Sequence, residues 1–187
     1  MQQRPEPIPV YAEMGSINPV FFLGAALNQK PEELAVGLHG SVTLGVGQFC
    51  TNPGLVFIES CEGAKVFMQK LELLIAATPA GTMLTADLCA SYRTGVGKFS
   101  GVTGVRRLAM RSTDPGPGKA QAGAAWFATE AATFLANHTL MDEVFGPSTL
   151  VVQCSSRGQV LEAAKKAGIG MCELTPQSVE QWLAYAL

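Results

Sequence analysis

The chain has 187 residues, of which 48% are hydrophobic and 15% are charged, and its formal net charge is −2. A chain of this length forms about one domain with a sizeable core. The apolar content excludes a disordered chain, and the balance of 13 basic against 15 acidic residues excludes a generic basic nucleic-acid-binding protein. No apolar run is long enough to span a membrane, and the N-terminal sequence lacks the apolar core of a secretory signal. We therefore expect a cytoplasmic protein whose five cysteines are reduced thiols.

The first half of the chain alternates short apolar runs with helical patterns. Residues 8–12 form a strand candidate flanked by prolines, and residues 16–23 predict a turn followed by a buried strand. Pro31 followed by two glutamates predicts the start of a helix that runs toward residue 48. Its four glycines each cost about 1 kcal/mol relative to alanine, so either packing holds this helix or its glycines admit a close neighbour. Three more elements follow: a strand at 54–59, a helix at 62–77 and a helix at 82–94.

The second half of the chain continues the alternation. Residues 95–123 are rich in glycine and proline and predict a strand embedded in loops. The remaining candidates are strands at 124–129 and 148–154 and helices at 157–168 and 177–186. Alternating strands and helices predict an α/β fold with at least some parallel pairing. Because no domain boundary stands out, residues 1–187 are expected to form one domain.

One cysteine occupies a setting unlike that of the other four. Cys50 lies between glycines on one side and Asn-Pro-Gly on the other, in residues 45–54, a pattern typical of a loop that joins a helix to a strand. Small neighbours expose a thiol and let a substrate approach, so Cys50 is a candidate nucleophile. The alternative is a buried cysteine that packs as a small apolar side chain. We assign that packing role to the others: Cys61, Cys89, Cys154 and Cys172.

A thiol nucleophile needs a base, and the sequence offers histidines and carboxylates. His39 lies in the apolar helix candidate and favours a packed or surface role, whereas His138 favours an exposed one. Glu13 follows the strand candidate at 8–12 and precedes a flexible turn, a place where sites form in α/β sheets, and Glu143 lies in a second tight segment. Two histidines without clustered acids or cysteines argue against a zinc site. Neither a P-loop nor a complete dinucleotide fingerprint is present.

Three segments, in this order, resemble motifs of one enzyme family. They are residues 10–19 (V-Y-A-E-M-G-S-I-N-P), 47–54 (G-Q-F-C-T-N-P-G) and 143–147 (E-V-F-G-P). They are similar to the catalytic-half motifs of the aldehyde dehydrogenase superfamily, and their wording looks like that of 2-oxoglutarate semialdehyde (2,5-dioxopentanoate) dehydrogenases and related NADP-linked fatty-aldehyde enzymes. The resemblance covers roughly residues 4–154. It implies a three-layer α/β catalytic half, truncated and without the Rossmann-like nucleotide domain, and it leaves residues 155–187 as a divergent tail.

The resemblance assigns the reacting groups. Cys50 would be the nucleophile that attacks the aldehyde carbon and then carries the acyl thioester, after a hydride has passed to NAD or NADP. Glu13 would be the general base that activates water for hydrolysis of the thioester. The backbone N–H of Cys50 would form half of the oxyanion hole.

The resemblance also assigns binding residues. Glu143 would hold the hydroxyls of the nicotinamide ribose, and Phe145 would pack near the nicotinamide ring. Phe49 and Thr51, which flank the nucleophile, would shape the substrate pocket. No metal is implied, and full-length relatives are expected to form homo-oligomers.

Three hypotheses follow. The first is NAD(P)+-dependent oxidation of an aldehyde, with 2-oxoglutarate semialdehyde as the favoured substrate, by a truncated chain expected to bind the dinucleotide poorly. The second is a degenerate structural or binding remnant that pairs with another subunit, which exposed apolar surface would favour. The third is a cofactor-free cysteine hydrolase that uses His39 or His138 as its base.

Overall fold

The core of the protein is a five-stranded sheet. The computed structural model of the chain describes residue 9 and residues 15–110 and 119–167. The strand order is β1-β2-β7-β6-β4, in which the first four strands run parallel and β4 pairs antiparallel with β6. The bounds are β1 Pro19–Phe22, β2 Leu55–Glu59, β7 Ser148–Cys154, β6 Ala125–Glu130 and β4 Val105–Met110. Two short strands, β3 Gly81–Thr82 and β5 Gln121–Ala122, form a separate antiparallel pair.

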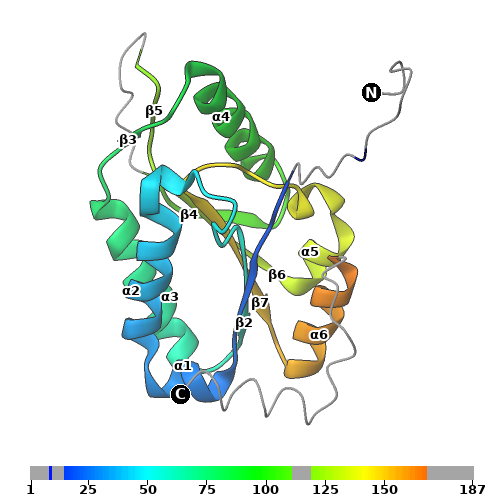
Figure 1. Ribbon diagram of the computed structural model, residues 1–187. Helices are drawn as coiled ribbons and strands as arrows, with labels where there is room; N and C mark the ends of the chain where they lie inside the picture. The colour runs from blue at the N-terminus through cyan, green and yellow to red at the C-terminus, as the bar shows by residue number, and fades with distance from the viewer. Residues whose placement is uncertain (1–8, 10–14, 111–118, 168–187) are drawn as a thin grey trace.

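Helices cover both faces of the sheet and make the expected three layers. One face carries α1 Gly24–Gln29, α2 Pro31–Thr43 and α3 Glu62–Ala77, and the other carries α4 Ala86–Ser100, α5 Ala131–Ala136 and α6 Arg157–Lys166. Figure 1 shows α2 and α3 on one side of the sheet and α5 and α6 on the other. Two short 3₁₀ helices, η1 Leu44–Gly47 and η2 His138–Met141, lie in the connections. Among the described residues, no helix has both the length and the apolar character that a membrane span requires.

The central strands are apolar throughout because both of their faces are buried. In β2, Leu55 and Phe57 contact the layer of α4 and α5, whereas Val56 and Ile58 contact the layer of α2 and α3. The Phe57 ring meets the edge of Phe134 from α5 at a centroid distance of 5.5 Å. Strands that are buried on both faces have continuous apolar sequences. The strand predictions for 54–59, 124–129 and 148–154, which rest on such runs, are confirmed.

The helix predictions are confirmed in part. The helix at 62–77 is confirmed, and the one at 157–168 ends at Lys166. The helix predicted at 82–94 begins at Ala86 and continues to Ser100, so the loop prediction is wrong for residues 95–100. Tyr92, Val96 and Phe99 bury one face of α4 against the sheet, and this burial outweighs the cost of the two glycines in its last turns.

Several elements were not predicted, and some predictions cannot be compared. The sequence patterns did not reveal α1, α5, β3 or β5, which are all six residues or shorter. The strand at 16–23 is confirmed as β1, but it is half-buried because it lies at the edge of the sheet. The predicted strand at 8–12, apart from Pro9, and the predicted helix at 177–186 lie outside the described residues, as does Cys172.

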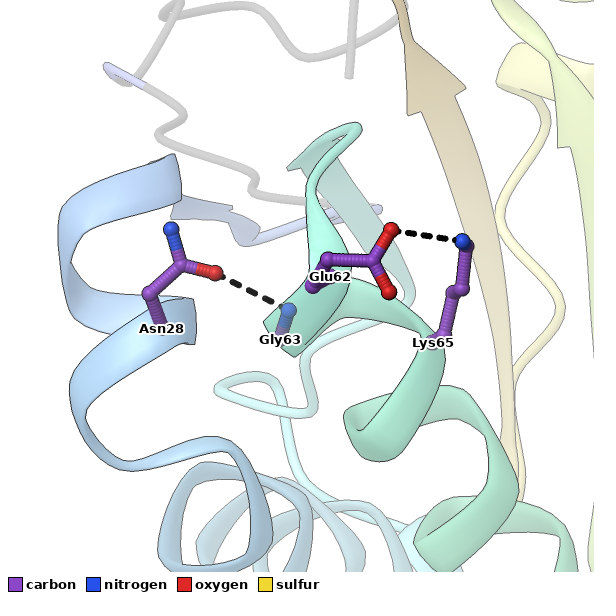
Figure 2. Close-up of polar contacts among 4 residues, drawn as sticks. All are labelled: Asn28, Glu62, Gly63 and Lys65. Carbon is purple, nitrogen blue, oxygen red and sulfur yellow. Dashed lines mark hydrogen bonds and ion pairs between the residues drawn. The ribbon is translucent and has the colours of Figure 1, made fainter.

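The short helix α1 is held against α3 by a close backbone contact. A Cβ on Gly63 would lie 2.1 Å from the carbonyl oxygen of Leu27, so only glycine allows this approach. The Gly63 N–H donates to Asn28 Oδ1 at 2.9 Å, as Figure 2 shows. Figure 2 also shows the exposed ion pair of Glu62 and Lys65, which contributes little to stability. This backbone contact positions α1, a helix that the hydrophobic periodicity of the sequence did not predict.

Candidate active site

The described parts of the three family-like segments meet at one edge of the sheet. Residues 15–18 precede β1, residues 47–54 precede β2 and residues 143–147 precede β7. These strands are neighbours and run parallel, so their amino-terminal ends share an edge. We expected Glu13 at the end of a strand, where α/β sheets commonly place their sites. The described segments instead converge at the amino-terminal edge, and Glu13 itself lies outside the described residues.

Cys50 lies on an exposed turn whose backbone accepts hydrogen bonds from side chains that precede β1. The turn is closed by the Asn52 N–H, which donates to the carbonyl oxygen of Phe49 at 3.0 Å. The carbonyl oxygen of Cys50 accepts hydrogen bonds from Ser16 Oγ and Asn18 Nδ2. Within the described residues, no acceptor takes the backbone N–H of Cys50. Because Cys50 is exposed, the alternative of a buried, packed cysteine is wrong at this position.

The loop before Cys50 has an unusual backbone. The predicted helix toward residue 48 ends at Thr43, and Gly45, Val46 and Gly47 follow with φ values of 54°, 60° and 65°. This left-handed region costs a β-branched residue such as Val46 free energy, so the surrounding structure must hold it. The side chain of Gln48 contributes, because its Nε2 donates to the Gly45 carbonyl at 3.0 Å and its Oε1 accepts the Leu84 N–H at 2.8 Å. Strain of this kind is a feature of functional loops.

Direct contacts join the three segments. A Cβ on Gly47 would lie 2.3 Å from the carbonyl carbon of Gly146, so the two backbones are in contact. Asn52 Nδ2 donates to the Gly146 carbonyl oxygen at 3.1 Å. On the other side, Oε2 of Glu143 would lie 3.2 Å from a Cβ on Gly15. Of the four glycines expected to admit close neighbours, Gly45 and Gly47 do so, whereas Gly37 and Gly40 of α2 have open space around them.

Glu143 and Phe145 line a small cleft between these segments. Its walls also include Ser16, Asn52 and Phe99. The cleft is next to an open groove of about 380 Å³ along α4, which Glu143 also lines. Glu143 is exposed, and within the described residues its carboxylate has no hydrogen-bond or ion-pair partner. A carboxylate without a protein partner is available to accept hydrogen bonds from a ligand.

The residues predicted to shape the substrate pocket flank Cys50 on the same turn. Thr51 is exposed, and the Phe49 side chain is 47% exposed although its ring contacts Gly45. An aromatic side chain left so accessible beside a thiol offers an apolar contact to a small molecule.

Neither histidine is linked to Cys50 by a hydrogen bond in the described part of the chain. His39 is half-buried on α2, where its Nε2 lies 2.6 Å from Thr78 Oγ1 and its ring lies near that of Trp126. Burial lowers the pKa of His39 below its usual 6.5. His138 is exposed in η2. His39, expected to be a packed or surface residue, is half-buried, and the expectation of an exposed His138 is confirmed.

The other described cysteines are structural. Cys89 and Cys154 are buried and Cys61 is half-buried at the start of α3. Burial, followed by the nearby carboxylates of Glu130 and Glu59, raises the pKa of Cys154 to about 11. This thiol therefore stays protonated at neutral pH. In the part of the chain that the structure describes, no cluster of three histidine, cysteine or acidic side chains could hold a metal ion.

The sequence reasoning did not single out Ser16, Asn18 or Asn52, which organise the turn. The available signal was a repeated Asn-Pro pair, at 18–19 and 52–53, inside two of the three motifs. An asparagine before proline favours turns and can donate through its side chain.

Comparison with known proteins gives the family likeness. No protein-family model matches the chain. It is 44% identical over 162 residues to alpha-ketoglutaric semialdehyde dehydrogenase 2 of Azospirillum brasilense, covering 84% of this chain and 30% of that protein. It is 32% identical over 170 residues to the alpha-ketoglutaric semialdehyde dehydrogenase of Acinetobacter baylyi, covering 88% of this chain and 31% of that protein.

Solved structures agree on the fold. An NAD-dependent benzaldehyde dehydrogenase from Corynebacterium glutamicum superposes with a TM-score of 0.64 at 16% identity, over 82% of this chain and 33% of the other. The chain spans about a third of the length of each of these three proteins. By sequence and by fold, the chain is therefore similar to the aldehyde dehydrogenases.

Proposed function

We propose that this chain is the catalytic portion of an NAD(P)+-dependent aldehyde dehydrogenase that oxidises 2-oxoglutarate semialdehyde to 2-oxoglutarate in the cytoplasm. The observation that carries the proposal is the exposed Cys50 turn, which residues of the two other motif segments hold in place. The substrate follows from the curated relatives, both named for alpha-ketoglutaric semialdehyde, which is the same compound.

The chemistry starts at Cys50. Its thiolate sulfur attacks the aldehyde carbon, the new C–S bond forms, and the carbonyl electron pair moves onto oxygen. The backbone N–H of Cys50, which has no acceptor within the described residues, donates a hydrogen bond to that oxyanion. When the C=O bond re-forms, the carbon loses hydride and an acyl thioester remains on Cys50. NAD(P)+ supplies the acceptor for this hydride.

Hydrolysis of the thioester returns the enzyme to its starting state. Glu13, by its place in the first motif, takes a proton from water, and the water oxygen attacks the acyl carbon. The C–S bond breaks, the Cys50 thiolate leaves, and the carboxylic acid is released. Gly15, two residues after Glu13 in the sequence, lies against the carboxylate of Glu143, and this contact of the described part of the first motif supports the role proposed for Glu13.

The cleft is only about 10 Å³, so a nicotinamide nucleotide would occupy the adjoining groove of about 380 Å³, which Glu143 also lines. A ribose has two neighbouring hydroxyl donors, and Glu143 presents a carboxylate without a protein partner in the described region. Phe145 lines the cleft next to that groove, and its ring would pack near the nicotinamide ring. Phe49 and Thr51 would contact the aldehyde beside the nucleophile.

Ester hydrolysis tests the assembled nucleophile without the cofactor. We expect the purified chain to release nitrophenol from a nitrophenyl ester, because the Cys50 thiolate displaces nitrophenolate and water then hydrolyses the thioester. Cys50→Ala should reduce release to the rate without protein, and Cys61→Ala, which removes a half-buried thiol, should match the wild type. Equal rates for wild type and Cys50→Ala would contradict the proposal.

A further inference from the structure

We propose that Asn18 is a positioning residue for Cys50, assisted by Ser16. This inference rests on the proposed function for its catalytic consequence. The Nδ2 group of Asn18 donates both to the carbonyl oxygen of Cys50 and, at 3.2 Å, to that of Asn52. Ser16 Oγ donates to the same Cys50 carbonyl. The Asn18 side chain thus bonds Cys50 and Asn52, the two residues that flank Thr51 in the second motif. We call these bonds, together with that of Ser16, the clamp.

Asn18 lies directly before a strand of the sheet. Asn18 has a φ of 36°, in the left-handed region that asparagine tolerates better than most residues. It directly precedes Pro19, the first residue of β1, and Pro19 is paired in register with Leu55 of β2. The sheet therefore sets the separation between Asn18, at the start of one strand, and the Cys50 turn, which leads into the next.

The described carbonyl oxygens of the Cys50 turn that face Asn18 are occupied by hydrogen bonds. The Phe49 carbonyl oxygen accepts the Asn52 N–H. The Cys50 carbonyl oxygen accepts from the side chains of Asn18 and Ser16. The Asn52 carbonyl oxygen accepts from the Gly54 N–H and from Asn18. Among the described residues, the N–H of Cys50 has no acceptor. With the Cys50 carbonyl oxygen bonded by the clamp, the group that stays available next to the thiol is the Cys50 N–H, a donor. A fixed donor can stabilise a developing oxyanion without reorganising during the reaction.

Two variants separate the amide donor from the backbone conformation. Asn18→Gly removes the side chain and keeps access to positive φ. Asn18→Asp keeps the shape but replaces the N–H donor by a carboxylate oxygen facing two carbonyls. The matched control is Asn28→Asp, because Asn28 uses its oxygen to accept the Gly63 N–H and an aspartate can do the same.

Hydrogen exchange measures the clamp without any substrate. The Asn52 and Gly54 N–H groups close the turn, so their exchange reports its opening. In Asn18→Gly and Asn18→Asp we expect these amides to exchange about tenfold faster, as loss of one to two hydrogen bonds allows, with the amides of β2 unchanged. Asn28→Asp should exchange like the wild type at both amides. Unchanged exchange at Asn52 and Gly54 in both Asn18 variants would overturn the clamp.

Ester kinetics measure the catalytic consequence. We expect Asn18→Gly to lower kcat about tenfold with KM within about twofold of wild type, because the turn, not substrate binding, is disturbed. Faster exchange with an unchanged kcat would overturn the positioning role. A wild-type chain no faster than Cys50→Ala would instead refute the proposed function, and the exchange measurement would still decide whether Asn18 holds the turn.

Discussion

Gly47 and Gly146 are in backbone contact, with Gly47 at a φ of 65° and only 2.3 Å between its missing Cβ position and the carbonyl carbon of Gly146. This contact joins the loop before Cys50 to the segment that carries Glu143. It brings two motifs from distant parts of the chain to one place, and it depends on the absence of a side chain at residue 47.

Gly47→Ala should therefore be strongly destabilising. The new methyl group would collide with backbone atoms, and the left-handed conformation disfavours alanine, so we expect a loss of about 2–4 kcal/mol in the free energy of unfolding. Urea denaturation measures this loss. The control is Gly37→Ala on α2, where nothing lies within 4 Å, and which should gain up to about 1 kcal/mol. Similar stabilities for the two variants would contradict the contact.

The buried thiol of Cys154 should make the protein less stable in alkali. Its pKa rises from 9.0 to about 11 on folding, so the folded state keeps a proton that the unfolded state releases. Stability therefore falls as pH rises above 9.0 and stops falling above about 11, with a total loss of about 2–3 kcal/mol.

Cys154→Ala isolates this contribution. Burial also raises the pKa of Tyr92 above its usual 10.0, and this effect is common to both proteins, so it cancels in the comparison. In urea denaturation at a series of pH values, the difference between wild type and variant should shrink above pH 9.0. A difference that is independent of pH would show that Cys154 does not titrate as described.

His39 should oppose folding in mild acid. Its pKa is lowered by burial, so the unfolded chain binds a proton more readily than the folded one. Stability is then fully present above 6.5 and is lost as pH falls through the lower pKa of the folded state. His39→Gln removes this titration, and the pH dependence of the melting temperature between about pH 5 and 7 should become flatter. His138→Gln, which changes an exposed residue, should leave the dependence as in the wild type.

The same two variants test the cysteine-hydrolase hypothesis. If Glu13 serves Cys50 as the base, ester hydrolysis should be retained in His39→Gln and His138→Gln and lost in Glu13→Gln. Loss of hydrolysis in either histidine variant, with Glu13→Gln active, would favour the hydrolase instead.

Asn52 should tolerate aspartate poorly. Its Nδ2 donates to the Gly146 carbonyl, and a carboxylate oxygen in that place would repel it. The side-chain oxygen of Asn52, Oδ1, is buried without a hydrogen-bond partner among the described residues, so added negative charge gains nothing there. We expect Asn52→Asp to lower the free energy of unfolding by about 1–3 kcal/mol at neutral pH, measured by urea denaturation. Asn28→Asp again serves as the control, and equal stabilities would show that the Asn52 contact is weak.

The sequence by itself determined the α/β class, the central strands and the longer helices. Short apolar runs such as 54–59 and 148–154 are typical of strands buried on both faces, and the apolar stripe of α3 has the helical period. The setting of Cys50 between small residues likewise predicted an exposed thiol, which the structure confirms. These features depend on local composition, and local composition is readable along the chain.

Only the tertiary structure decided how the turn around Cys50 is held. The left-handed Val46 lies against Gly81, and Gln48 accepts the Leu84 N–H, and no local pattern contains these contacts. The same holds for Asn18 on the Cys50 carbonyl and for Gly47 against Gly146, because each pair is brought together by the parallel pairing of β1, β2 and β7. Strand pairing sets which loops meet, and that is a property of the folded chain alone.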